Sequence, residues 1–243
     1  MTNVEINPHW PRLQNELVGM RWLGILLTVV VAVLVIYKAN FPTYSYRYRL
    51  QISLSVDEKL YTGSSVIEVV WKCGPHITGL GRCVPYLGGQ AAVVDLGSRG
   101  AVVATLGTGE NIIPVPDGAV DAVFICANAF GNRSIDEELP ALPRLTGRRD
   151  LSPSNFPRLV WFSNPADMTS AQKITIENVA NVIESTARFT EAFVEITSDP
   201  VVMNIATKLP WFPAFKLAQK GKGVLSMPGQ FQLVYNMFVG ESW

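Results

Sequence analysis

The stretch CGPHITGLGRC, residues 73–83, holds the side chains best suited to chemistry, because two of the three cysteines flank one of the two histidines. Thiolates and imidazoles are preferred ligands of Zn²⁺, so Cys73, His76 and Cys83 form a candidate metal site, with Cys126 as a fourth ligand. Their spacing matches no common zinc pattern, and Cys126 falls in an apolar helical stretch where a small buried residue is expected. We therefore predict no bound metal and keep a metal-binding envelope protein as an alternative.

A disulfide between Cys73 and Cys83 is a second interpretation of the same stretch. In the chain-entropy model, a bridge that closes so short a loop contributes about 2.5 to 3 kcal/mol to stability. Such bridges persist only in oxidising compartments, so this interpretation also predicts a domain outside the cytoplasm. Ordinary free thiols are the third alternative.

Other candidate catalytic groups are weaker. Ser170 and Lys173 have the spacing by which some serine enzymes activate a nucleophile, but no second signature of those enzymes accompanies them. A helical turn capped by Thr169 explains the same residues. The acidic pair Glu137 and Glu138 lies in a proline-rich stretch and is expected to be solvated. The sequence thus assigns no catalytic residue and favours a non-catalytic role, with an envelope hydrolase as an alternative.

The charge balance and the glycine pattern argue against two further classes, nucleic-acid-binding proteins and dinucleotide-binding enzymes. Lys+Arg and Asp+Glu each number 20, and basic residues do not cluster with aromatics, so nucleic acid is not an expected partner. The glycine pairs at 79/81 and 107/109 lack the third glycine and the strand-to-helix context of a dinucleotide fingerprint. We therefore expect no cofactor.

A membrane segment is the clearest feature of the N-terminal region. Sixteen uncharged residues, Trp22 to Tyr37, lie between Arg21 and Lys38. As a helix they cover about 24 Å, a little less than the roughly 30 Å hydrocarbon core of a bilayer. Arg21 and Lys38 can reach the headgroups by snorkelling, and Trp22 and Tyr37 suit the two interfaces.

Two other interpretations of this segment are a buried core helix and a cleaved signal peptide. No amphipathic stripe favours a core helix, and the best small-residue cleavage site, at Ala39, has the bulky Tyr37 at its −3 position. We therefore predict an N-terminal tail over 1–21, an uncleaved transmembrane signal anchor over 22–38 and a domain over 44–243.

Charge and the cysteines predict opposite orientations of the anchor. The nearby positive side chains are Arg12 and Arg21 before the segment and Lys38, Arg47 and Arg49 after it. This count slightly favours a cytoplasmic C-terminal domain, but long domains translocate largely regardless of charge. Because the disulfide interpretation argues the other way, we expect the domain outside the cytoplasm.

Strands dominate the expected domain. Strict apolar alternation over 46–56 predicts a half-buried strand, and the β-branched run 64–71 predicts a more central one, paired with the first as a long hairpin. Between them, DEKLYTG looks like a polar link. A second hairpin is expected from the runs 91–96 and 101–106 around a turn with Gly97 and Gly100. The stretch 188–199 predicts a further strand.

Two short helices complete the expected fold, an antiparallel, mainly β (α+β) domain. One covers 118–131 with Asp117 as its cap, and the other covers 176–185 with Thr175 as its cap. The four prolines of 139–157 predict a surface loop. The aromatic stretch 209–215 fits either the core or an exposed docking patch.

Several stretches in order, YRYRLQISLSV, TGSSVIEVVW, GGQAAVVDLG, PRLVWFSNPAD and EITSDPVVMNIATKLPWF, resemble a group of uncharacterised bacterial membrane-associated proteins. The resemblance covers most of 46–212 and implies a single-pass protein of the bacterial inner membrane with a periplasmic domain. It implies no activity and no catalytic residue, and the Cys73/Cys83 loop is outside its pattern. The expected function is that of a binding or scaffolding module, such as an accessory subunit of a membrane complex, with the lipid bilayer and other membrane proteins as partners.

Overall fold

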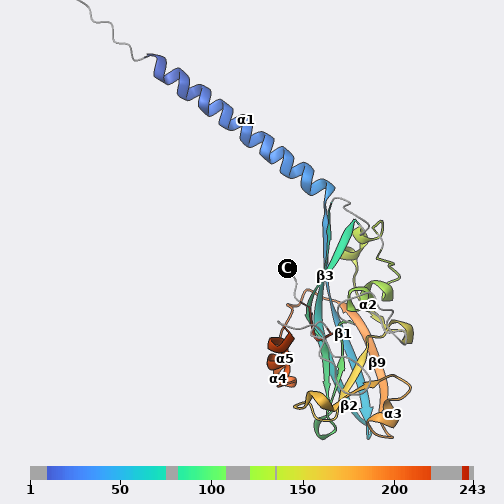
Figure 1. Ribbon diagram of the computed structural model, residues 1–243. Helices are drawn as coiled ribbons and strands as arrows, with labels where there is room; N and C mark the ends of the chain where they lie inside the picture. The colour runs from blue at the N-terminus through green and yellow to red at the C-terminus, as the bar shows by residue number, and fades with distance from the viewer. Residues whose placement is uncertain (1–9, 75–81, 108–120, 135, 220–236, 241–243) are drawn as a thin grey trace, which may run out of the picture. The chain divides into compact units, whose positions relative to one another are not determined.

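The N-terminal unit of the chain is one long helix. A computed structural model describes residues 10–74, 82–107, 121–134, 136–219 and 237–240, with side chains from Trp22 onward. Helix α1, Trp10–Asn40, begins inside the predicted tail and continues through the predicted membrane segment (Figure 1). Its part from Trp22 to Asn40 has a mean hydropathy of 2.3 and is long and apolar enough to cross a membrane, as predicted.

A long hairpin organises the domain. Strands β1, Thr43–Val56, and β2, Lys59–Cys73, pair antiparallel along their whole length, so the predicted hairpin is confirmed. The expected polar link is wrong, since Asp57 and Glu58 alone form the turn, both at positive φ. Apolar side chains of β1 alternate into the core as expected, from Tyr46 to Val56.

Sheet A contains six strands in the order β10-β3-β2-β1-β9-β6, so β2 is central as predicted. Its other members are β3, Cys83–Gln90, β6, Arg148–Asp150, β9, Arg188–Ile196, and β10, Val239–Gly240. The strand expected at 188–199 is β9. The loop expected at 139–157 is wrong in part, because β6 and the 3-10 turns Leu139–Arg144 and Pro153–Asn155 lie within it.

Sheet B is smaller and lies against sheet A. Its order is β4-β5-β7-β8, formed by Ala92–Asp95, Ala101–Ala104, Leu159–Phe162 and Ala171–Ile174. The predicted two-glycine hairpin is the β4–β5 pair, with Gly97 and Gly100 at positive φ. Strand β4 contacts β1, and a side chain at Gly63 of β2 would collide with the Val93 backbone, so the two sheets approach closely at this glycine.

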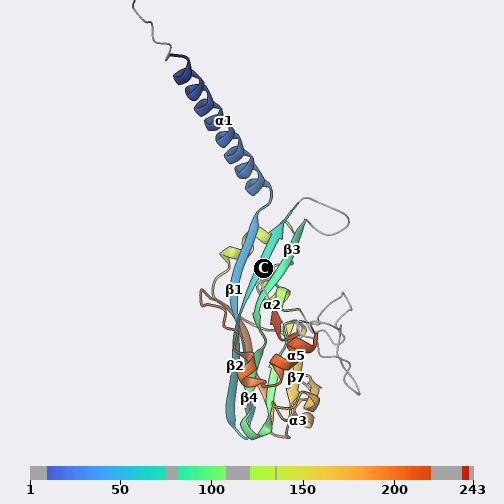
Figure 2. The ribbon, with the colours of Figure 1, turned by 60° about the vertical axis from the view of Figure 1, so that its left-hand side comes forward.

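One face of sheet B is covered by two short helices. These are α4, Ile205–Lys208, and α5, Phe212–Gln219, which lies over β4 and β7 in Figure 2. Leu209, Phe212 and Phe215 join Phe162 and Phe238 in one buried cluster. Ring centroids in this cluster lie 5.9 to 6.4 Å apart for the Phe238 pairs with Phe162, Phe212 and Phe215. The stretch 209–215 is therefore core and not a docking patch.

The other two helices are shorter than expected. Helix α2, Ala122–Ala129, is capped by Asp121, while the predicted cap Asp117 lies outside the described residues. Helix α3, Val179–Val182, is a single turn. Before it, the Thr175 hydroxyl accepts the Asn178 N–H and the Asn178 side chain accepts the Thr175 N–H, so Thr175 caps the turn that leads into α3, as predicted. The fold is nevertheless the expected one, an antiparallel, mainly β domain with a few short helices.

Candidate functional site

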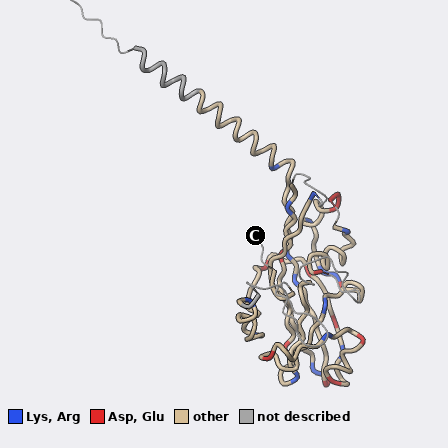
Figure 3. Tube along the Cα trace, viewed as in Figure 1, with Lys and Arg blue, Asp and Glu red and all other residues tan. Residues whose placement is uncertain are grey.

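Helix α1 is predominantly apolar from Trp22 to Asn40. Every residue from Trp22 to Asn40 is exposed, and Lys38 is the charged residue among them. In Figure 3 the described part of this helix is almost entirely tan, the colour of uncharged residues. The Thr28 hydroxyl donates to the Gly24 carbonyl at 2.9 Å, so the helix leaves this polar group satisfied internally. Trp22 and Tyr37 stand at the two ends of the apolar stretch, and the side chain of Arg21 lies outside the described residues.

The cysteines differ in their surroundings. Cys73 ends β2 and Cys83 begins β3, and both are disulfide-bonded, whereas Cys126 is a buried free thiol in α2. His76 lies outside the described residues. Within the described part of the chain, no three His, Cys, Asp or Glu side chains gather closely enough to hold a metal ion.

Ser170 serves a turn. Its hydroxyl lies 2.7 Å from the Asp167 carbonyl and 2.9 Å from the Asn164 carbonyl, both acceptors. Ser170 ends the 3-10 turn Met168–Ser170, whose cap is Asp167. The Asp167 carboxylate accepts from the Thr169 N–H and hydroxyl, so the predicted cap by Thr169 is wrong. Hydrogen bonding to Thr169 also lowers the pKa of Asp167. A hydroxyl donating to carbonyls inside a turn is not an activated nucleophile.

A cluster of buried polar side chains lies under α2, and the sequence did not predict it. The hydroxyls of Tyr46 and Tyr48 donate to the carbonyls of Val123 and Ala122 in the first turn of α2. Burial raises the pKa of both phenols and raises the pKa of the Cys126 thiol to about 12. A neutral thiol beside two neutral phenols is a poor nucleophile. This cluster therefore fastens α2 to β1.

Asp121, the cap of α2, is an acidic residue of this region. Its carboxylate accepts the Val123 N–H at 3.0 Å and lies against Gly107, where an added Cβ would be 2.7 Å from Oδ2. Burial raises its pKa, an effect that the Val123 bond opposes. The folded state therefore binds a proton more tightly than the unfolded state does, and ionised Asp121 lowers stability above its folded-state pKa.

Asparagine at this position should keep the cap and remove the buried charge. We expect Asp121→Asn to raise the melting temperature at pH 7, and the gain to disappear as the pH falls below the unfolded pKa of about 3.9. Asp121→Ala, which loses the cap, should lower it at both pH values. Thermal unfolding of the three proteins in detergent checks this. A gain with Asp121→Asn that persists unchanged at pH 3 would contradict the burial argument.

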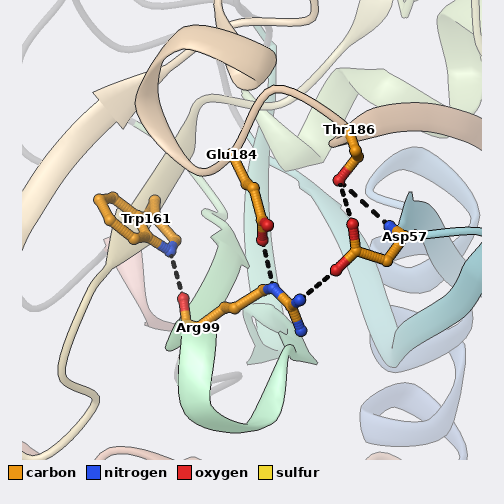
Figure 4. Close-up of polar contacts among 5 residues, drawn as sticks. All are labelled: Asp57, Arg99, Trp161, Glu184 and Thr186. Atoms are coloured by element: carbon orange, nitrogen blue, oxygen red, sulfur yellow. Dashed lines mark hydrogen bonds and ion pairs between the residues drawn. The ribbon is translucent and has the colours of Figure 1, made fainter.

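One ionic network joins three turns at the end of the β1–β2 hairpin that holds Asp57 and Glu58 (Figure 4). Arg99, in the β4–β5 turn, donates to the carboxylates of Asp57 and Glu184. Asp57 also accepts from the Thr186 hydroxyl at 2.8 Å, and the Trp161 indole N–H donates to the Arg99 carbonyl at 2.8 Å. Hydrogen bonding to Glu184 raises the pKa of Arg99.

This network is a structural cluster of ion pairs and not an active site. We call its three charged residues, Asp57, Arg99 and Glu184, the clasp. One permanent cation is matched by two carboxylates, and the groups drawn in Figure 4 are engaged with one another. General acid–base catalysis needs a group whose pKa lies near the operating pH, and a paired guanidinium does not offer one. The contacts instead tie the hairpin of sheet A to the hairpin of sheet B.

Loss of this clasp should weaken the domain. Arg99→Gln should lower the melting temperature by a few degrees because Asp57 and Glu184 then lie close together without their shared cation. The matched control is Arg188→Gln, since Arg188 is exposed at the start of β9. The difference between the two variants should shrink in 1 M NaCl, as screening weakens exposed pairs. Equal melting temperatures at low salt would refute the clasp.

Charged side chains on the outer face of sheet A form ion pairs between neighbouring strands. Arg47 bonds Glu68 at 2.9 Å across β1 and β2, and Arg49 bonds Glu195 at 3.3 Å across β1 and β9. Arg148 of β6 stacks 3.5 Å from the Phe193 ring centroid. In both ion pairs, opposite charges face each other across neighbouring strands, which stabilises the pairing of these strands.

Comparisons with known proteins add no functional assignment. No protein-family model matches the chain, and neither a curated protein nor a solved structure does.

Proposed function

We propose that the chain is a single-pass membrane protein whose β-rich domain acts outside the cytoplasm as a binding or scaffolding module, for example as an accessory subunit of a membrane complex. The observation that supports this proposal is the part of α1 from Trp22 to Asn40, where no residue is buried and mean hydropathy is 2.3. Leaving a large aliphatic side chain in water, compared with burying it, costs about 1.5 to 3 kcal/mol. Insertion into a lipid bilayer takes the apolar side chains of this part of α1 out of water and so removes this cost.

The compartment is part of the proposal. Both Cys73 and Cys83 are disulfide-bonded, and such bonds persist in oxidising compartments. The resemblance to bacterial membrane-associated proteins supports the same orientation, with the anchor in the inner membrane and the domain in the periplasm. The slight excess of positive residues on the domain side opposes it, but weakly for a domain of this length.

A binding role is supported by exposed apolar side chains in the domain. Val202 and Met203 are neighbours in the chain and are 53% and 52% exposed, in the segment between β9 and α4. Adjacent exposed apolar side chains suit a contact with another protein, and methionine adapts to irregular surfaces. Other membrane proteins are the partners proposed, and nucleic acid is not.

Thiol labelling in cells tests the compartment. A membrane-impermeant maleimide is applied to intact cells with a permeabilised outer barrier, before and after reduction. We expect Cys73 and Cys83 to label only after reduction, because they are oxidised and outside the cytoplasm. Buried Cys126, with its raised pKa, should label only after denaturation and is the internal control. Labelling that requires lysis would place the domain in the cytoplasm and overturn the orientation.

Cross-linking tests the binding role. A photoreactive amino acid in place of Met203 should yield a defined cross-linked membrane protein in cells, whereas the same probe in place of exposed Leu60 should not. Recovery of the full chain as a lone monomer after gentle extraction, with no cross-linked product at position 203, would count against a scaffolding role.

A further inference from the structure

The end of the domain where β1 begins carries a distinctive set of side chains, which we call the juxtamembrane rim. Its members are Lys72, Arg82, Val84, Tyr86 and Phe124. Lys72 pairs with Thr43, the first residue of β1, while Arg82 and Val84 flank Cys83 at the start of β3. Phe124 of α2 contacts Trp71 with ring centroids 6.1 Å apart, on the face of β2 opposite to that of Lys72, so the rim includes both faces at this end of the sheet.

Apolar and cationic side chains of the rim are both at the surface. Val84 is 41% and Phe124 is 36% exposed, although both are large hydrophobic residues. Lys72 and Arg82 are exposed, and the Lys72 ammonium lies 4.7 Å from the centroid of the Tyr86 ring. Aromatic, aliphatic and long basic side chains together suit the boundary between headgroups and acyl chains.

Chain length keeps Thr43, the first residue of β1, close to the end of α1 in any orientation of the domain. Only Phe41 and Pro42 separate the last residue of α1, Asn40, from Thr43 of β1. A fully extended chain gains at most about 3.5 Å per residue, so Thr43 lies within about 10 Å of Asn40. If α1 spans a bilayer with Lys38 at its edge, Thr43 and its partner Lys72 reach the headgroup layer.

We infer that the juxtamembrane rim docks on the headgroup layer of the bilayer that holds α1, with anionic phospholipid as its ligand. Lys72 and Arg82 meet lipid phosphates, while Val84 and Phe124 enter the boundary with the acyl chains. The inference rests on the proposed membrane anchor, and it adds a fixed surface through which the domain contacts lipid. Docking would limit the tilt of the domain and hold the opposite end away from the membrane.

The opposite end of β2 supplies a control residue for the rim. Leu60 is an exposed aliphatic residue beside the β1–β2 turn and is 61% exposed. Lys72 lies twelve positions beyond Leu60 in β2, a distance of about 40 Å at 3.3 Å per residue. A surface that merely exposes apolar side chains would treat Leu60 and Val84 alike, whereas docking distinguishes them.

Spin-label accessibility in vesicles tests the inference on the full chain. A ketone-bearing amino acid replaces Val84, Phe124, Leu60 or Val30, one at a time, and receives a spin label without involving the native cysteines. The proteins are reconstituted into phosphatidylcholine vesicles with or without phosphatidylglycerol. Labels at 84 and 124 should show several-fold higher collision with oxygen relative to a water-soluble nickel chelate than the label at 60, and more so with phosphatidylglycerol. Combining Lys72→Gln with Arg82→Gln should remove the phosphatidylglycerol effect.

The outcomes separate the rim from the anchor. A water-exposed label at position 30 would overturn the membrane anchor and the rim with it. A lipid-exposed label at 30, together with labels at 84 and 124 as accessible to nickel as the label at 60, would overturn the docking alone. Lipid contact at 84 and 124 that does not respond to phosphatidylglycerol would overturn the assignment of anionic lipid as the ligand.

Discussion

A chain with arginine in place of both Val30 and Leu34 should lose its stable attachment to membranes. The two residues lie one turn apart near the middle of the apolar part of α1. Arginine at the centre of a membrane helix costs about 2.5 to 3.5 kcal/mol, so two cost about 5 to 7 kcal/mol. We expect this variant to leave the membrane fraction on alkaline extraction, while the parent chain stays with the lipid.

The control for this prediction keeps the apolar character of the helix. Val30→Leu with Leu34→Val exchanges two aliphatic residues and should extract like the parent chain. If the arginine variant resists alkaline extraction as the parent does, α1 does not hold the chain in the bilayer. If the parent itself is released, the apolar surface of α1 is covered by protein instead.

Alanine in place of Gly100 should destabilise the domain more than any other glycine substitution in the β4–β5 turn. Gly100 has φ +87, and an added Cβ would lie 1.9 Å from the carbonyl oxygen of Phe162 on β7. Its carbonyl also accepts the Leu96 N–H at 2.8 Å, so the turn cannot shift without breaking a bond of the hairpin. Strain and collision together predict a loss of more than about 4 kcal/mol, enough to prevent folding of many domains.

Substitution of Gly97 in the same turn distinguishes the cost of backbone strain from the cost of a steric collision. Gly97 has φ +67, but nothing lies within 4 Å of an added Cβ. Gly97→Ala should therefore cost only about 1 to 2 kcal/mol, the penalty of a left-handed backbone. Denaturant unfolding of both variants in detergent, followed by tryptophan fluorescence, measures the difference. Equal losses for the two variants would show that the close approach of β7 to the turn has no energetic weight.

Local patterns in the sequence predicted the elements that depend on neighbouring residues. The uncharged run 22–37 predicts a helix in any apolar surrounding, and the alternation over 46–56 predicts a strand with one buried face, since side chains point to opposite faces in turn. Gly97 and Gly100 predicted the turn between β4 and β5 because few other residues adopt positive φ.

Helix lengths were predicted less well for a physical reason. The apolar spacing around 118–131 and 176–185 suits a helix, but the observed helices are Ala122–Ala129 and Val179–Val182. Short helices in water gain most of their stability from tertiary packing and not from propensity. Helix α2 begins after Asp121, where the hydroxyls of Tyr46 and Tyr48 donate to the first carbonyls of the helix. These contacts join residues far apart in the chain, so no local pattern predicts them.

The sequence by itself determined the apolar helix, the long hairpin and the two-glycine turn, because each depends on hydrogen bonds and periodicity between residues near in the chain. Only the tertiary structure decided which strands share a sheet, which face of sheet B α4 and α5 cover, and that Arg99 meets Asp57 and Glu184. Those contacts join residues 42 and 85 positions apart, and their pairing depends on the packing of the whole domain.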